Sequence, residues 1–106
     1  MGGKRLMLRV ASTWWQRLRG LLGTDEGAAC LLLLNCRSIH TFGMRYAIDV
    51  AFVSSDGEVV RSERGVKPGR MLTVRGASSV LERPSSITWW PRQGERLSLL
   101  VSAGEN

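Results

Sequence analysis

Hydrophobic and polar positions alternate over short stretches of this chain, and turn residues separate the stretches. Alternation with a period of two is typical of β-strands, and regular turns between short strands are typical of sandwiches and barrels. The pattern predicts about eight short strands. These strands are expected among nine candidate segments, 5–10, 28–34, 39–42, 46–53, 58–61, 71–74, 79–82, 87–90 and 96–101.

The clearest strand is 46–53, which is rich in aromatic and β-branched residues. Its odd and even positions face opposite ways in an extended chain, and both faces are apolar except at Asp49. Segment 28–34 is uniformly apolar. It predicts a strand buried on both faces, with a short buried helix as the alternative.

One short helix is expected near the N-terminus. Thr13, with Gln16 three residues later, fits a capping box, and apolar residues follow at helical spacing over 14–22. Glycines mark the breaks elsewhere. Gly43 predicts a bulge or bend, and 54–57 predicts a hairpin turn with Gly57 at positive φ.

These elements define the predicted fold class. We expect one mainly β domain over 1–106, a small barrel or sandwich with one N-terminal α-helix and a frayed tail at 103–106. Gly65, Pro68 and Gly69 should mark a loop within it. The strand spacing disfavours a parallel α/β fold.

Charge adds a clue about partners. The formal net charge is +6, and thirteen of the fifteen basic residues are arginine, whose guanidinium groups suit phosphate and carboxylate. The basic residues are spread along the chain, whereas nucleic-acid-binding proteins usually cluster them on one face. We therefore expect an anionic small ligand or an acidic protein as partner and disfavour nucleic acid.

Cysteine content and hydropathy indicate the cellular compartment in which the protein is expected. Cys30 and Cys36 are too few for a disulfide framework, and no apolar run reaches the length of a membrane span. The start of the chain carries no signal-peptide pattern. We expect a cytoplasmic protein that does not bind membranes and is a monomer.

Asp49 is the sharpest chemical feature. An ionised carboxylate in an apolar strand is costly unless it is paired. Asp49 should therefore accept hydrogen bonds from backbone N–H groups or from Arg17, Arg37 or Arg45, or else remain protonated. A structural ion pair is the first interpretation, and a charge at the mouth of a pocket is the second.

His40 is the only histidine, and Cys36 is its nearest cysteine. A Cys–His nucleophilic pair is disfavoured, because an extended 36–40 segment would hold the two side chains about 13 Å apart. One histidine and two cysteines cannot fill a four-ligand zinc site. The sequence contains no phosphate loop and no nucleotide-binding fingerprint, so no metal or cofactor is expected.

Four tryptophans occur as two adjacent pairs, 14–15 and 89–90. Neighbouring residues cannot both face the core, so one member of each pair should be partly exposed. An exposed tryptophan could contact a partner, but the alternative that all four cover the edge of a small core is favoured.

Two segments carry a family resemblance. Residues 17–23 contain an Arg-x-x-Gly-Leu helix end, and 36–52 contain an aromatic-x-Met-basic segment followed by Ile-Asp-Val-x-Phe. With the Asp-Gly hairpin at 56–57, they resemble the domain-of-unknown-function 192 family. The chain departs at Ala47, where the family often has proline, and after residue 82. The resemblance implies a jelly-roll-like β-domain with one short helix, and no known substrate, cofactor or catalytic residue.

We interpret the chain as a non-catalytic binding or adaptor module for an anionic small ligand or a peptide. Its candidate site is a cationic, partly apolar recess. The candidate binding residues are Arg17, Arg37, His40, Thr41, Met44, Arg45 and Asp49. One alternative is an enzyme, hydrolase-like or of another kind, with His40 or Asp49 as general base. The other is weak nucleic-acid binding through dispersed arginines.

Overall fold

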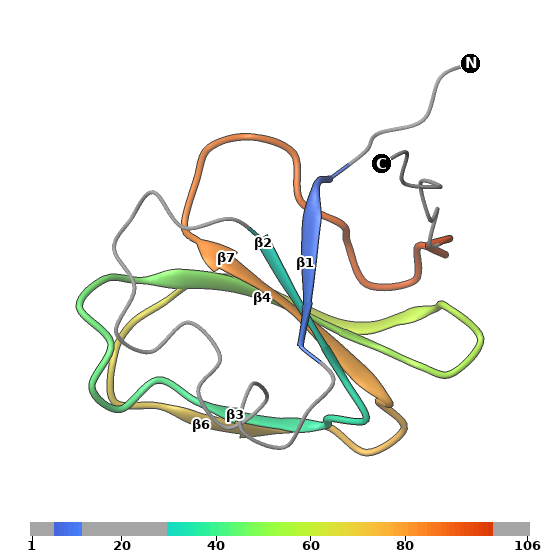
Figure 1. The fold of residues 1–106 in the computed structure, drawn as a ribbon, viewed down its shortest axis with the longest axis horizontal. Helices are drawn as coiled ribbons and strands as arrows, with labels where there is room; N and C mark the ends of the chain where they lie inside the picture. The colour runs from blue at the N-terminus through green and yellow to red at the C-terminus, as the bar shows by residue number, and fades with distance from the viewer. Residues whose placement is uncertain (1–5, 12–29, 99–106) are drawn as a thin grey trace, which may run out of the picture.

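The computed structural model describes residues 6–11 and 30–98, and the architecture over these ranges is mainly β (Figure 1). Seven strands form two sheets within the described residues. They are β1 (Leu8–Ala11), β2 (Cys30–Leu34), β3 (Ser38–His40), β4 (Ile48–Val53), β5 (Val59–Val66), β6 (Met71–Thr73) and β7 (Ser79–Pro84).

The larger sheet has five strands in the order β1-β2-β7-β4-β5. β1 pairs with β2 in parallel, and the other neighbours in this sheet are antiparallel. β3 and β6 form a separate antiparallel pair. β4 lies between β7 and β5, and all six of its residues are buried because a hydrophobic cluster packs on each of its faces.

The two faces of β4 contact two different hydrophobic clusters, as the alternation predicts. Ile48, Val50 and Phe52 belong to one cluster, and Ala51 and Val53 belong to the other. β2 alternates in the same way, since its odd and even positions divide between the two clusters. The prediction that 28–34 contains a doubly buried strand rather than a helix is therefore confirmed over Cys30–Leu34.

The small β3–β6 sheet covers the face of the larger sheet that carries the even positions of β4. Ile39 from β3 and Leu72 from β6 are buried in the same cluster as Val50 and Phe52. In Figure 1, β3 and β6 run together along one side of the larger sheet. The residues that alternate with Ile39 and Leu72 consequently face outward and are exposed.

Two glycines show how the turns are built. Gly57 has φ +92°, and its N–H donates to the Ser54 carbonyl at 3.0 Å, which confirms the predicted hairpin. Gly65 was expected in a loop, but it lies inside β5. The pairing of β4 with β5 shifts between Ile48 and Val50, so Gly65, at φ +66°, occupies a β-bulge.

Other sequence predictions need correction. The described strands do not form a closed barrel, because the larger sheet ends at β1 and β5 and the β3–β6 pair is hydrogen-bonded separately. Residues 87–90 are not a strand, since arginine side chains bind their carbonyl groups instead. From the predicted strand 96–101, Arg96 forms an isolated bridge with Glu58. The predicted N-terminal helix and residues 99–101 lie outside the described residues.

None of the segments described here is a helix with the length and apolar character needed to cross a bilayer.

Candidate functional site

Asp49 and Arg83 form a buried ion pair between neighbouring strands. The two residues are register partners on β4 and β7, and Arg83 Nε donates to Asp49 Oδ2 at 2.9 Å. Their side chains are 0% and 8% exposed. Asp49 also accepts from the Gly65 N–H at 2.9 Å and the Ser85 hydroxyl at 3.1 Å through Oδ1, and from the Ser86 N–H at 3.2 Å through Oδ2.

The guanidinium of Arg83 organises the segment that follows β7. It donates to the Thr88 hydroxyl and the Trp89 carbonyl, both at 3.0 Å, and to the Thr88 carbonyl at 2.9 Å. Its central carbon lies 4.5 Å from the centroid of the Trp90 ring. Trp90 is buried and donates to the Val50 carbonyl at 3.2 Å, which ties this segment to β4. Trp89 is only half-buried, as expected for one member of the pair.

The prediction that Asp49 is buried and paired is confirmed, but its expected arginine partner is wrong. Arg37 and Arg45 are exposed, and Arg17 lies outside the described residues. Arg83 takes this position because β7 is the neighbour of β4 in the sheet. One sequence signal was available, since Arg83 is a charged residue at the end of an apolar strand, just as Asp49 is a charged residue within one.

The hydrogen bonds of Asp49 decide whether its carboxylate can act as a general base or has a structural role. Both carboxylate oxygens accept two hydrogen bonds each, and the side chain has no exposure to solvent. A general base needs an oxygen that a substrate can reach. This carboxylate therefore fixes the positions of β5, β7 and the 85–90 segment.

Thr41 forms a second structural junction, between the turn after β3 and the loop before β6. It is fully buried, and its hydroxyl donates to the Lys67 carbonyl and accepts from the Arg70 N–H, both at 2.8 Å. The Thr41 carbonyl accepts from the N–H groups of Met44 at 3.2 Å and Gly69 at 3.1 Å. The predicted bend at Gly43, whose φ is +82°, is confirmed within this turn.

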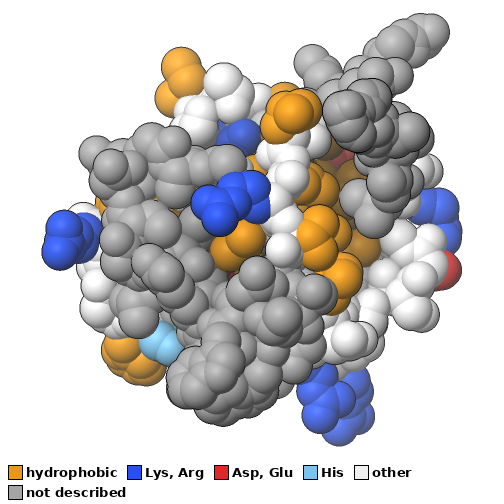
Figure 2. Space-filling model, viewed as in Figure 1, with side chains coloured by type: hydrophobic (Ala, Val, Ile, Leu, Met, Phe, Trp, Pro, Cys, Tyr) orange, Lys and Arg blue, Asp and Glu red, His pale blue; other side chains and the backbone are white. Residues whose placement is uncertain are grey.

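An aromatic and thioether surface lies beside this junction. His40 stacks on Phe42, with ring centroids 5.7 Å apart and an interplanar angle of 25°. Met71 is the register partner of His40. Phe42 is 51% exposed and Met71 is 66% exposed, although apolar side chains usually lie inside. Figure 2 shows the histidine at the surface next to exposed hydrophobic side chains.

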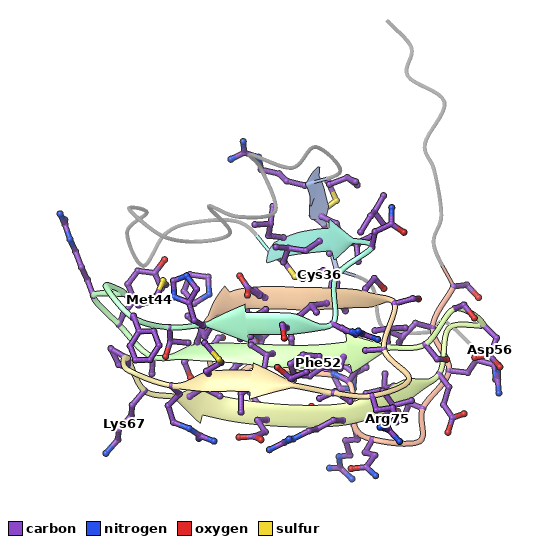
Figure 3. The ribbon with its side chains drawn as sticks, turned by 90° about the horizontal axis from the view of Figure 1, so that it is seen from below. Cys36, Met44, Phe52, Asp56, Lys67 and Arg75 are labelled. Carbon is purple, nitrogen blue, oxygen red and sulfur yellow. The ribbon has the colours of Figure 1, made fainter. Side chains whose placement is uncertain are left out.

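Cationic residues border this surface at both ends. Arg37 and Arg75 flank one end, where the Val74 N–H donates to the Arg37 carbonyl at 2.9 Å. Lys67 and Arg70 lie at the other end, where the Thr41 N–H donates to the Arg70 carbonyl at 2.7 Å, and the exposed Arg45 lies in the turn region after Thr41. In Figure 3, Lys67 and Arg75 lie near opposite ends of β6. Segments 35–48 and 64–78 contain no aspartate or glutamate, but Arg70 Nη1 pairs with Glu63 Oε1 of β5 at 3.6 Å.

We call this surface the β3–β6 face. Its centre consists of Ser38, His40, Phe42, Met71 and Thr73, and its rim consists of Arg37, Arg45, Lys67, Arg70 and Arg75. All ten residues are exposed.

The sequence-predicted site residues do not form one group. His40, Thr41 and Met44 meet at the corner after β3, with Thr41 and Met44 buried and His40 exposed. Met44 belongs to the cluster between the sheets. Asp49 points away from that cluster, toward the side of β4 on which Arg83 and Trp90 lie.

Sequence reasoning missed seven of the ten residues of the β3–β6 face. The candidates did not include Ser38, Phe42, Lys67, Arg70, Met71, Thr73 and Arg75. Phe42 lies within the resembling motif and could have been considered. The residues of β6 and its flanking loops become relevant only through pairing with β3, more than thirty residues earlier in the chain.

The two cysteines of the described segments lie in different environments. Burial raises the pKa of the Cys30 thiol to about 12, against the opposing field of Arg83. Cys36 Sγ donates to the Ser38 carbonyl at 3.1 Å. Across 6–11 and 30–98, no group of three or more His, Cys, Asp or Glu side chains is placed to hold a metal ion.

Comparison with known sequences gives a family match. The model of family DUF192, described as "Uncharacterized ACR, COG1430", matches residues 1–89. A UPF0127 protein of Thermococcus sibiricus is 34% identical over 88 residues, in an alignment that covers 76% of this chain and 56% of that protein. The chain thus spans little more than half the length of this relative.

Solved structures share the fold. A protein of unknown function from Novosphingobium aromaticivorans superposes with a TM-score of 0.66 at 19% identity, covering 76% of this chain and 64% of that chain. A protein of Sinorhizobium meliloti, proposed there to be a transcription regulator, superposes with a TM-score of 0.67 at 20% identity, covering 76% and 69%. At these identities the likeness concerns the fold alone.

Proposed function

The chain belongs to the DUF192 family of uncharacterised proteins, as its resemblance implied, and on this premise we propose that it is a binding module for an anionic partner. The partner binds the β3–β6 face. The observation that carries this proposal is the exposed cluster of His40, Phe42 and Met71, bordered by five cations from two segments that lack carboxylates.

The composition of the face supports an interaction surface. Exposed apolar groups bordered by polar residues often mark a binding site, because burying apolar area yields about 25 cal/mol per Å². The rim adds four guanidinium groups and one ammonium group, and guanidinium forks pair well with carboxylate and phosphate. Both the apolar centre and the charged rim therefore contribute to the binding free energy of an anionic partner.

The described geometry supports binding more than catalysis. The Asp49 carboxylate is enclosed by four hydrogen bonds. His40 is exposed and stacked on Phe42, and within the described ranges its ring is not oriented by a hydrogen bond to a carboxylate or hydroxyl group. A general base is normally oriented by such a partner.

Chemical-shift mapping with inorganic tripolyphosphate and an oligo-glutamate peptide tests the proposal. We expect shifts at the backbone amides of His40, Phe42 and Met71, and weaker binding by the K67Q/R75Q variant. The control variant R9Q/R92Q removes two exposed charges outside the face. Equal weakening by both variants, or shifts confined to other surfaces, would refute the placement.

A further inference from the structure

We infer that the anionic partner of the β3–β6 face is a single-stranded nucleic acid, whose bases stack on the exposed rings while its phosphates contact the rim. This inference rests on the proposed function and names the class of partner.

Strand pairing places the stacking groups on one surface. Ser38 pairs with Thr73, and His40 pairs with Met71, while the alternating residues Ile39 and Leu72 are buried beneath them. The outward side chains therefore project from a short sheet rather than from a flexible loop. Sheets that present aromatic rings are a recurrent platform for unpaired bases. Here β3 presents His40, and Phe42 stacks on His40 from the turn that follows the strand.

The His40–Phe42 stack suits a base in particular. A base requires an accessible ring face, and Phe42 remains 51% exposed after stacking on His40. Met71 lies beside His40 and extends the apolar surface. A peptide, by contrast, gains most from side chains inserted into enclosing pockets, whereas the exposed His40 ring belongs to β3 and the exposed Phe42 ring to the turn that follows it.

The fold also brings together basic residues that are far apart in the sequence. Nucleic acid was disfavoured because the basic residues are dispersed along the chain. Pairing of β3 with β6 brings Arg37 close to Arg75, since the Val74 N–H donates to the Arg37 carbonyl at 2.9 Å. At the other end, the Thr41 N–H donates to the Arg70 carbonyl at 2.7 Å. These contacts bring basic residues of two distant segments together, which favours a clustered positive charge, although Arg70 pairs with Glu63 at 3.6 Å.

A single strand is favoured over a duplex for two reasons. Bases in a duplex are stacked on one another and cannot also stack on protein rings, so stacking requires an unpaired strand. The strands of the face have three residues each and are about 10 Å long. The face can therefore contact only a short stretch of the nucleic-acid backbone.

The experiment measures binding of the full chain by fluorescence anisotropy at low and at moderate salt. The probes are a labelled twelve-nucleotide oligo-dT, a duplex of the same length, an oligo-glutamate peptide and tripolyphosphate. The key variant is F42L, which retains an apolar side chain but removes the ring. I87A is its control, because Ile87 is an exposed apolar side chain outside the β3–β6 face and its substitution removes no ring. Circular dichroism verifies that both variants fold.

We expect oligo-dT to bind more tightly than the duplex and the peptide, and its affinity to fall steeply with salt. F42L should weaken oligo-dT binding by about fivefold or more, the size of one base stack, and leave tripolyphosphate binding unchanged. If the peptide binds more tightly, or F42L has no selective effect, the inference is wrong while the proposed function stands. If no polyanion binds the face, the proposed function fails as well.

Discussion

Arg83 lies directly opposite Asp49 on the neighbouring strand, and its guanidinium contacts the Asp49 carboxylate, the 88–89 backbone and the face of Trp90 together. One ion pair thus connects β4, β7 and the segment after β7. This arrangement satisfies two charges that would otherwise be very costly inside the domain. No described buried side-chain N or O atom lacks a hydrogen-bond partner.

Replacing Asp49 with asparagine should strongly destabilise the domain. D49N leaves the Arg83 guanidinium buried without a counter-charge, and loss of one partner from a buried pair costs about 3–5 kcal/mol. Urea unfolding measures the change. D56N is the matched control, because Asp56 pairs with Arg96 at the surface, and its effect should be far smaller.

A double variant tests the coupling between the two charges. D49N/R83M removes both charges, so its free energy of unfolding should fall by less than the sum of the two single effects. Strictly additive losses would show that the pair is not the unit that stabilises this region.

Asp56 should produce a pH dependence at the acidic end. Hydrogen bonds from Ser54 and then Arg96 lower the pKa of Asp56 from 3.8 to about 2. Because the folded pKa lies below the unfolded one, the stabilisation is complete above pH 3.8 and is lost as the pH falls toward 2. NMR titration of the carboxyl group measures the folded pKa, and D56N should lack this part of the stability profile. A carboxyl that titrates near 3.8 in the folded protein would contradict the prediction.

Gly57 and Gly76 should respond differently to alanine. Both have φ of +92°, so each substitution strains the backbone by about 1–2 kcal/mol. A Cβ at Gly57 would also lie 2.5 Å from the Leu97 carbonyl oxygen, while a Cβ at Gly76 meets nothing within 4 Å. Urea unfolding should therefore show a larger loss for G57A. Equal losses would mean that the 96–98 segment moves away freely.

The two cysteines should differ in reactivity. Burial raises the pKa of Cys30 from 9.0 to about 12, so its thiol stays protonated at pH 8, whereas Cys36 is half-buried. Iodoacetamide should modify Cys36 first and reach Cys30 only after denaturation, as peptide mass spectrometry can measure. The C36S variant should take up little label when folded. Rapid labelling of Cys30 in that variant would argue against its burial.

Much of the larger sheet could be predicted because its signals are local. The alternation over 46–53 identified a strand with two apolar faces, and the Asp-Gly turn identified the hairpin after it. Segment 87–90 was misassigned because its side chains have strand propensity, while the buried Arg83 binds its carbonyls. Gly65 was misassigned because a bulge and a loop both require positive φ.

The sequence by itself determined the mainly β class, the two faces of β4 and the need of Asp49 for a partner. These follow from the period of the side chains and from the energetic cost of a buried charge. Only the tertiary structure decided that the partner is Arg83 and that β6 lies beside β3. Pairing between distant strands depends on the packing of the whole core, and no local pattern specifies which strands will be neighbours.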